Sequence, residues 1–353
     1  MATERFDWKG LPVCVTGGTG FLGIHIVQQL VQAGARVTVL ALEPWPNHPL
    51  FRIANVSHVF GDISDPQSVR RAVRASAVIF HTAGIVAVWG PALQRMHQVN
   101  VIGTQNVLDA APPGARIMHT SSIVAVAASR QGKPVNEDTP FNLSRVDLPY
   151  VHSKRAAEKL ALAAAAQGRD VVVTNPGYLV GPEDHLRSIM GRLCARFWRA
   201  RMLVATPGGF SLADVRDVAA GHLLAAQHGV SGRRYILAGD NHTMHELLTM
   251  LADVAHYAPR ALPLLPAWSQ TLLAGLSETR ARLSGREPYP SFAHVRLNSY
   301  SWYANSDRAA AELGYRRRPL AESLRDTYEW FRANAAIKLT SLSRWWLRPG
   351  AAA

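Results

Sequence analysis

The stretch 13-VCVTGGTGFLG-23 decides the fold class of this chain. A short apolar run, Val13 to Val15, leads directly into glycines at positions 17, 20 and 23. Glycines at this spacing allow a tight turn, a close approach of the backbone to a pyrophosphate, and packing of the following helix on its strand. The free N–H groups at the start of that helix favour negative charge. The stretch therefore predicts a nucleotide site between a first strand and a first helix.

Alternating strand-like and helix-like segments continue from this turn to about Pro176. Such alternation is typical of a doubly wound parallel sheet, which is a Rossmann-type α/β fold. After Pro182 the composition changes to arginine-rich and proline-interrupted segments, which indicate a smaller C-terminal substrate lobe. We expect a dinucleotide-binding domain over 10–182, a substrate lobe over 183–335, and a basic aromatic tail over 336–353. The expected strands are 13–16, 37–40, 57–60, 77–81, 116–120 and 171–175, with 235–238 returning to the sheet.

Tyr150 and Lys154 lie one helical turn apart, ahead of an Ala/Glu/Lys/Leu-rich run at 156–167. Because that run predicts a continuing helix, both side chains share one face. An ammonium group beside a phenol favours the phenolate, so it lowers the pKa of the tyrosine from its usual value of about 10. Such a phenol can exchange a proton with a carbonyl or hydroxyl oxygen. A nicotinamide dinucleotide in the predicted nucleotide site would supply the hydride that this chemistry needs.

A pair of hydroxyl side chains, Ser121 and Ser122, follows the strand expected at 116–120. Open parallel sheets place functional groups at the carboxyl ends of their strands. Either hydroxyl could therefore donate a hydrogen bond to a substrate oxygen beside Tyr150. The order of the glycine turn, Thr-Ser-Ser and Tyr-x-x-x-Lys along the chain is more specific than any one of these motifs.

In this order, the motifs resemble the extended short-chain dehydrogenase/reductase superfamily, also known as the NAD-dependent epimerase/dehydratase family. The resemblance covers about residues 13–335. Within the superfamily, the chain looks most like the branch of dihydroflavonol reductases, 3β-hydroxysteroid dehydrogenases and hopanoid-associated sugar epimerase-like proteins. Segments similar to further landmarks of the group are Gly61-Asp62-Ile63, His81-Thr82-Ala83-Gly84, Asn100-Val101-Ile102-Gly103-Thr104, Asn175-Pro176-Gly177, 213–222 and 312–315.

The resemblance implies a role for each of these residues and an NAD(P) cofactor. Tyr150 would be the proton donor or acceptor, Lys154 would bind the nicotinamide ribose and lower the tyrosine pKa, and Ser122 would orient the substrate carbonyl. Ser121 is the alternative for the last role. The implied cofactor contacts are Gly17, Gly20, Phe21, Leu22, Gly23, Asp62, Ile63, His81, Ala83, Gly84, Asn100, Tyr150, Lys154 and Pro176.

The end of the expected second strand departs from the superfamily pattern, which places there an acidic residue for NAD or an arginine for NADP. Here the strand runs into Ala41 and Leu42, so both side chains are missing. Glu43 lies one residue beyond and favours NAD, whereas Arg52 could serve the extra phosphate of NADP. The sequence therefore favours NAD and leaves NADP open.

The net charge of +13 comes almost entirely from arginine, because lysine occurs only five times. No nucleic-acid-binding module accompanies this charge, so we expect no nucleic-acid partner. Two cysteines exclude a disulfide framework, and the scattered histidines form no metal-ligand motif, so no metal is expected. A polar N-terminus and the lack of a long apolar run predict a cytoplasmic protein.

Two basic clusters allow two interpretations each. Arg187, Arg192, Arg196, Arg199 and Arg201 could hold a diphosphate or another anionic group of the substrate, or form a solvated helix face. The tail over 336–353, with Trp345 and Trp346 among cations, could contact a membrane surface or pack on its own domain. A homodimer is also left open.

The leading functional hypothesis is an oxidoreductase that interconverts a secondary alcohol and a ketone by hydride transfer. A nucleotide-sugar epimerase that oxidises its substrate transiently is the alternative within the same chemistry. A dinucleotide-binding sensor without catalysis is a third hypothesis, which the complete Ser-Tyr-Lys set disfavours. Bulky side chains suited to an apolar pocket favour the oxidoreductase: Trp89, Phe210, Trp302 and Tyr303.

Overall fold

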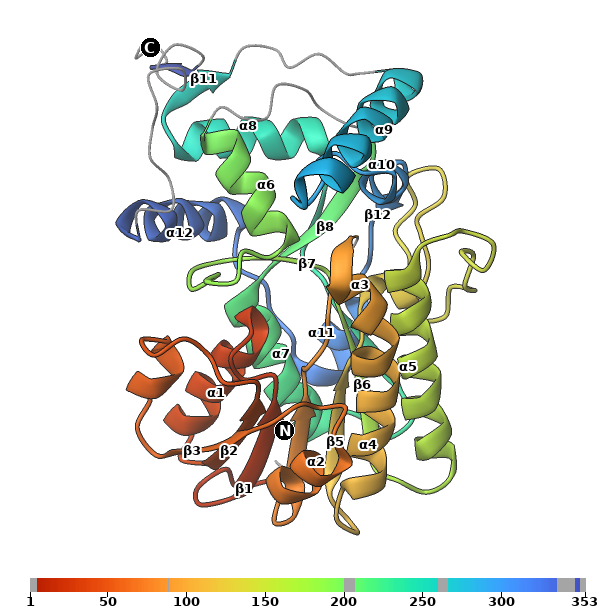
Figure 1. Cartoon of the computed structure of the whole chain (residues 1–353). Helices are drawn as coiled ribbons and strands as arrows, with labels where there is room; N and C mark the ends of the chain where they lie inside the picture. The colour runs from red at the N-terminus through yellow and green to blue at the C-terminus, as the bar shows by residue number, and fades with distance from the viewer. Residues whose placement is uncertain (1–4, 88, 200–206, 260–265, 335–346, 350–353) are drawn as a thin grey trace.

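A seven-stranded parallel sheet forms the centre of the molecule, in the order β3-β2-β1-β4-β5-β6-β9 (Figure 1). The computed structural model describes residues 5–87, 89–199, 207–259, 266–334 and 347–349. The predicted Rossmann-type sheet is confirmed, and its expected strands agree with the observed ones to within one residue at each end. The strands are β1 (Pro12–Thr16), β2 (Arg36–Ala41), β3 (Val56–Phe60), β4 (Val78–His81), β5 (Arg116–Thr120), β6 (Val171–Pro176) and β9 (Arg234–Leu237).

Helices cover both faces of this sheet because its strands are apolar on both sides. Successive side chains of β1 point in opposite directions. Val13 and Val15 pack into one buried cluster with Ile26 of α1, whereas Cys14 packs into another with Ala161 of α5. The helices of these layers are α1 (Phe21–Gln32), α2 (Pro66–Val73), α4 (Gly103–Ala110), α5 (Pro149–Ala166), α7 (Val215–His228) and α11 (Asp307–Leu313).

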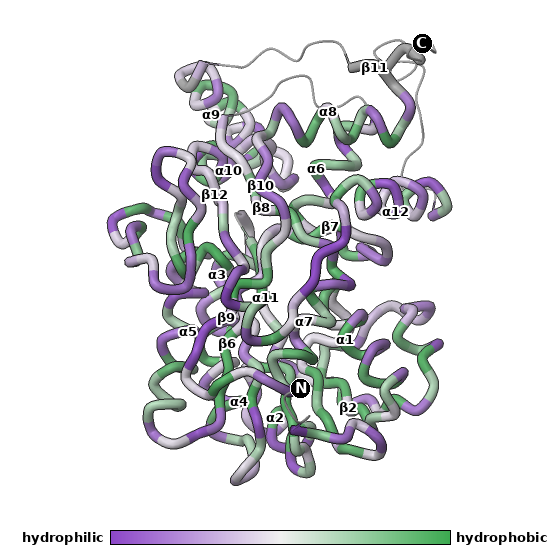
Figure 2. Tube along the Cα trace, turned by 180° about the vertical axis from the view of Figure 1, so that it is seen from behind, coloured by the Kyte–Doolittle hydropathy of each residue, from purple (hydrophilic) through white to green (hydrophobic). Residues whose placement is uncertain are grey.

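A second, smaller sheet lies beyond the carboxyl ends of the central strands. Its strands are β7 (Tyr178–Val180), β8 (Gly209–Asp214), β10 (Asp240–Thr243) and β12 (Ser301–Trp302). The helices around it are α6 (Ile189–Trp198), α8 (Met244–Val254), α9 (Ala267–Ser284), α10 (Phe292–Asn298) and α12 (Leu320–Ala333). Helix α3 (Gly90–His97) instead packs against α5, beside the central sheet. In Figure 2 the upper part alternates hydrophilic and hydrophobic segments, while hydrophobic residues gather around β2.

The chain passes between the two parts several times, because α7, β9 and α11 return to the layers of the central sheet. The substrate lobe is therefore not one continuous segment. Of the expected tail, 336–346 and 350–353 lie outside the described residues, and β13 (Leu347–Pro349) pairs antiparallel with β11 (Tyr257–Pro259). Within the described ranges, no helix is both long and apolar enough to span a lipid bilayer.

Candidate active site

The glycine turn connects β1 to α1 through contacts that only glycine permits. Gly17 adopts a φ of 74°, a conformation that L side chains rarely adopt. A Cβ atom added to Gly23 would lie 2.2 Å from the carbonyl oxygen of Gly17. The backbone N–H of Gly20 also donates to that oxygen at 2.9 Å. The turn is thus held close against the first turn of α1.

The start of α1 fits the pyrophosphate of a dinucleotide. Gly20 precedes the helix and has no side chain that could cap it. The first N–H groups of a helix lack partners within the helix, so they remain available to an anion. The side chains of Phe21 and Leu22 line the cavity that also contains the predicted catalytic residues. The predicted cofactor site and the predicted reaction site therefore adjoin.

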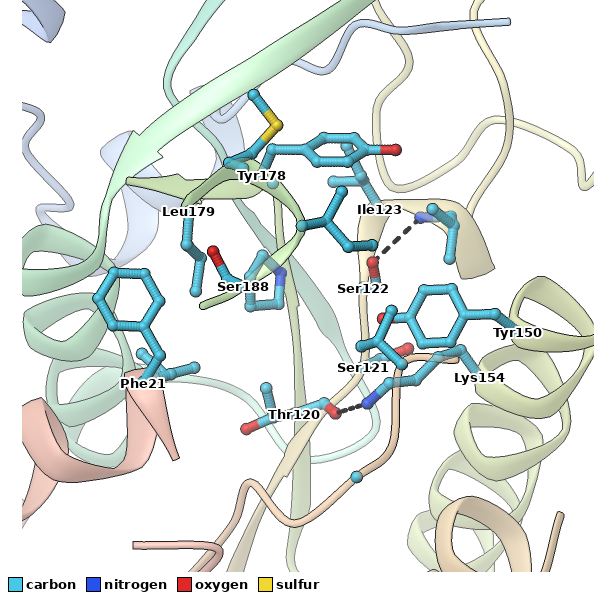
Figure 3. Close-up of a pocket in the computed structure, with 18 of the residues that line it drawn as sticks. Phe21, Thr120, Ser121, Ser122, Ile123, Tyr150, Lys154, Tyr178, Leu179 and Ser188 are labelled. Carbon is cyan, nitrogen blue, oxygen red and sulfur yellow. Dashed lines mark hydrogen bonds between the residues drawn. The ribbon is translucent and has the colours of Figure 1, made fainter. Parts of the chain in front are cut away.

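That cavity, called the active-site cavity here, has a volume of about 230 Å³. It opens at the carboxyl ends of the central strands, where open α/β sheets bind their ligands (Figure 3). Its lining includes Phe21, Leu22, Thr82, Gly84, Val86, Thr120, Ser121, Ser122, Ile123, Val124, Tyr150, Lys154, Pro176, Gly177, Tyr178, Leu179, Ser188, Ile189, Met190 and Leu297.

Tyr150 and Lys154 project into this cavity from the first turns of α5 (Figure 3). The Lys154 ammonium group donates to the carbonyl oxygen of Thr120 at 2.9 Å, at the end of β5. The Ser122 side chain lines the same cavity as the Tyr150 phenol and affects the pKa of that phenol. Burial lowers the pKa of Lys154 to about 8, and the negative charge of Glu158 opposes this shift.

The pKa of Tyr150 differs from the sequence-based prediction, which had Lys154 lowering it. Burial raises the pKa of Tyr150 to about 12, while the Ser122 side chain acts in the opposite direction. The Lys154 ammonium group donates to Thr120 and does not outweigh the loss of hydration around the phenol. The phenol is therefore protonated at neutral pH in this structure.

The two serines at the end of β5 occupy different surroundings. Ser121 is buried, and its hydroxyl donates to Glu158 at 2.6 Å. Ser122 is partly exposed to the cavity and interacts with Tyr150. Glu158 is completely buried on α5, where it also accepts hydrogen bonds from Asn175 and Arg234. Glu158 was not among the residues predicted from the sequence, although its i+4 spacing from Lys154 was a signal.

Several predicted cofactor residues contribute to the scaffold through their side chains. Both ring nitrogens of His81 form hydrogen bonds, to Thr16 at 2.8 Å and Thr104 at 3.0 Å. His81 therefore has no ring nitrogen free for a cofactor. Asn100 accepts from the backbone N–H of Ile85 at 2.7 Å and donates to Ser153.

The side chain of Asn100 thus joins the segment after β4 to α5. This segment includes Ala83 and Gly84; a Cβ atom on Gly84 would lie 3.4 Å from the Lys154 nitrogen. Asn100 itself lies in a π-helical turn at Gln98–Ile102, a rare conformation that often marks functional sites.

The residues that the sequence predicts beside the adenine of the cofactor follow β3. Asp62 accepts from Ser64 through one carboxylate oxygen and from Arg95 at 2.5 Å through the other. The carbonyl oxygen of Ile63 accepts from Asn106 of α4, and the Ile63 side chain is buried. Pro176 ends β6 and lines the active-site cavity.

The loop after β2 packs against the glycine turn through an unpredicted histidine. His48 is buried, donates to the carbonyl oxygen of Thr19 at 3.1 Å, and accepts from the N–H of Leu50. At the end of β2, Ala41 is buried and Leu42 is exposed. Sequence alone gave no signal for His48, because its partner is a backbone atom.

A smaller cavity, called the distal cavity here, adjoins the active-site cavity and has a volume of about 50 Å³. Of the four aromatic residues expected near the substrate, Phe210 lines it and Trp302 is buried in the core, whereas Trp89 and Tyr303 line neither cavity. Tyr178, which sequence reasoning missed, lines both cavities. The distal cavity is lined by Val86, Tyr178, Ile189, Met190, Arg192, Leu193, Arg196, Phe210, Tyr289, His294, Leu297 and Asn298.

Two members of the arginine cluster, Arg192 and Arg196, thus face a cavity. Arg187 and Arg199 are not among its lining residues, and Arg201 lies outside the described residues. In the described part of the chain, no group of three His, Cys, Asp or Glu side chains could hold a metal ion.

Comparison with known proteins identifies relatives along nearly the whole chain. A putative dihydroflavonol 4-reductase of Synechocystis is 31% identical over 343 residues, covering 95% of this chain and 99% of that protein. The human 3 beta-hydroxysteroid dehydrogenase type 7 is 32% identical over 339 residues, covering 85% of this chain and 90% of that protein. The crystal structure of gox2253 is 31% identical and matches with a TM-score of 0.79, covering 92% of this chain and 99% of that one.

The family model described as the NAD dependent epimerase/dehydratase family matches residues 13–238. This range contains the glycine turn, Ser122, Tyr150, Lys154 and the returning strand β9. The predicted resemblance is confirmed, and so is the class of enzyme that uses a nicotinamide dinucleotide. The chain belongs to the NAD-dependent epimerase/dehydratase family.

Proposed function

We propose that this protein interconverts a secondary alcohol and a ketone on an apolar small molecule, and that Tyr150 exchanges the proton on the reacting oxygen. The observation that carries the proposal is the meeting of Ser122, Tyr150 and Lys154 in one cavity that reaches the start of α1. A substrate oxygen placed between these hydroxyls would lie within the same cavity as the nicotinamide. Bound NAD supplies the hydride acceptor, or NADH the hydride donor.

The protonation states fit the proton transfer that ketone reduction requires. A phenol with a pKa of about 12 is neutral at pH 7, so it can donate its proton to the oxygen of a carbonyl group. Ser122 would hold the carbonyl oxygen with a second hydrogen bond. Lys154, with a pKa of about 8, is mostly protonated at pH 7 and would bind the ribose and stabilise the phenolate that remains after proton transfer.

The walls of the active-site cavity favour an apolar ketone over a nucleotide sugar. Val86, Ile189, Met190 and Leu297 line the route from the active-site cavity to the distal cavity. Sugar hydroxyl groups placed against these side chains would lose hydrogen bonds to water without replacement, which is costly. An aryl or ring ketone would instead gain from burial.

NAD is the proposed cofactor in preference to NADP. Glu43 is the only acidic residue between Leu42 and Arg52, and a carboxylate near the ribose would repel the additional phosphate of NADP. Arg52 could instead bind the extra phosphate of NADP, so the experiment must compare the binding of NAD with the binding of NADP. Titration of the purified protein with each dinucleotide would measure the preference directly.

The sharpest test of the reaction is to measure NADH oxidation with flavonoid-like ketones and oxosteroids, and epimerisation of UDP-sugars in parallel. We expect net NADH oxidation with a ketone and transfer of deuterium from labelled NADH to the substrate carbon. A UDP-sugar that is epimerised without any net change in NADH absorbance would contradict the proposal and establish the epimerase alternative.

Membrane contact by the tail over 336–353 and formation of a homodimer remain predictions. Co-sedimentation with anionic vesicles should be compared between the full chain and a chain ending at residue 335. Equal binding of the two would contradict a role of the tail at a membrane. Size-exclusion chromatography with light scattering would measure the oligomeric state.

A further inference from the structure

The distal cavity combines apolar walls with two guanidinium groups. It shares five lining residues with the active-site cavity, so the two spaces are neighbours: Val86, Tyr178, Ile189, Met190 and Leu297. Residues of α6 line both cavities. This helix leads away from the central sheet (Figure 1). Ile189 and Met190 lie at the shared boundary, and Arg192 and Arg196 follow one and two turns further along the helix.

Arg192 and Arg196 are partly buried, and neither forms an ion pair with a carboxylate of the described residues. The buried Asp184 lies at the start of this region, but its carboxylate accepts hydrogen bonds from the backbone and hydroxyl groups of Ser188. Burial raises the pKa of Asp184 and Arg192 opposes that shift. The segments that the structure does not describe contain a single acidic residue, Glu4.

The remaining polar groups of the distal cavity keep the arginines in place without neutralising them. The guanidinium carbon of Arg196 lies 3.3 Å from the centre of the Tyr289 ring, a cation–π contact that fixes its position. The ring of His294 is engaged with Ser291 through Nδ1. Burial and the two arginines lower the pKa of His294 to about 4, so it is neutral at pH 7. The cavity therefore holds net positive charge within apolar walls.

We propose that Arg192 and Arg196 bind a carboxylate at the far end of the substrate. The inference rests on the proposed function, because the apolar body of the substrate would extend from Tyr150 past Ile189 and Met190. Arg196 lies seven positions after Ile189 in α6, a rise of about 10 Å along the helix at about 1.5 Å per residue. The anionic group would thus bind up to two helical turns beyond the point where the substrate passes Ile189.

The distal cavity is small, with a volume of about 50 Å³, and most of its lining residues other than the two arginines are apolar or aromatic. Two guanidinium groups in such surroundings fit a compact anion such as a carboxylate. A nucleoside diphosphate would need far more space and more polar partners than these walls provide. Guanidinium groups bind carboxylates through paired hydrogen bonds, which become stronger where water is excluded.

The test uses the Tyr150→Phe variant saturated with NAD⁺, so that binding can be measured without turnover. The probes are 3β-hydroxyandrost-5-ene-17β-carboxylate and its methyl ester, which share one apolar body and differ in charge. We expect the acid to bind about 10- to 100-fold more tightly than the ester, as for a hydrogen bond to a charged group. Arg192→Gln and Arg196→Gln should abolish that difference, and Arg192→Lys should restore part of it.

Arg187→Gln is the matched control, because Arg187 belongs to the same cluster but does not line the distal cavity. It should leave the acid-to-ester ratio unchanged. Equal binding of acid and ester, or no binding of either, would overturn the inference. Tight binding of UDP-glucose that is lost in the same two variants would also overturn it and assign the arginines to a diphosphate. Binding with the expected preference but no turnover by the unmodified enzyme would overturn the proposed reaction alone.

Discussion

The glycine turn and the lining that the two cavities share are built in opposite ways. The turn uses seven consecutive residues, 17–23, whose backbone atoms contact one another directly. The shared lining brings together Val86, Tyr178, Ile189 and Leu297, which are up to 211 residues apart in the chain. The comparison teaches that recognition by backbone groups is encoded locally, while recognition by shape depends on how distant segments pack.

The largest effect is expected at the reaction site, which lies in the cavity that both the glycine-turn side and the substrate side help to line. Tyr150→Phe removes the group that exchanges the proton, so kcat should fall by about 10³-fold or more. The affinity for NAD should change by less than about twofold, because the ring remains and only a hydroxyl is lost. Steady-state kinetics and isothermal titration would measure the two quantities. Retention of more than a tenth of kcat would contradict the assigned role.

Substitutions of the two serines at the end of β5 should separate an effect on catalysis from an effect on stability. Ser122→Ala removes a donor to the reacting oxygen, so kcat should fall by about 10²-fold. Ser121→Ala leaves the buried Glu158 without one hydrogen bond, so its main effect should be a loss of about 1–3 kcal/mol in the free energy of unfolding. Kinetics and urea unfolding of both variants would test the contrast, which fails if Ser121→Ala has the larger effect on kcat.

Gly23→Ala tests whether the turn depends on backbone contact. The new Cβ atom would lie 2.2 Å from the Gly17 carbonyl oxygen, so the loop must move and the affinity for NAD should fall about 10- to 100-fold. Gly275→Ala in α9 is the control, because its Cβ atom would meet its nearest neighbour at 3.5 Å. Titration with NAD should find the control unchanged. An equal loss in both variants would indicate general destabilisation.

Buried histidines beneath the active site should make stability depend on pH. Burial lowers the pKa of His222 to about 4 and of His81 to about 3. The unfolded chain titrates near pH 6.5, so below that pH it binds protons that the folded protein does not. The free energy of unfolding should therefore decrease as the pH falls from about 6.5 toward 4.

His222→Gln should reduce this slope by up to about 1.4 kcal/mol per pH unit, the contribution of one proton. Urea unfolding at pH 7.5, 6.5 and 5.5 would measure the slope. The exposed His245 provides the control, since His245→Gln should leave the slope nearly unchanged. An unaltered slope in His222→Gln would show that other groups cause the pH dependence.

The smallest expected effect concerns the choice between dinucleotides. Glu43 is exposed, so its charge is screened by water and its effect should be modest. Glu43→Gln should reduce the ratio of NAD affinity to NADP affinity by about two- to fivefold. Parallel titrations would measure this ratio. Tighter binding of NADP by the unmodified protein would contradict the proposed preference at once.

Individual residues show which features of the protein could be predicted from the sequence and which could not. The strands could be predicted because their apolar runs are continuous, and even β9 was placed in the sheet. Ser122 was preferred over Ser121 on the resemblance alone, because the spacing of the residues does not show that Glu158 of α5 accepts from Ser121. The pKa of Tyr150 was predicted in the wrong direction, since the spacing to Lys154 carries no information about burial.

The sequence by itself determined the parallel sheet, the glycine turn and the shared face of Tyr150 and Lys154. These features follow from local spacing, periodicity and backbone conformation, which are properties of short segments. Only the tertiary structure decided which serine meets the tyrosine, that His81 is occupied by two threonines, and that Arg192 and Arg196 face a cavity. Those outcomes depend on contacts between segments far apart in the chain, where packing and exclusion of water fix each side chain's partners.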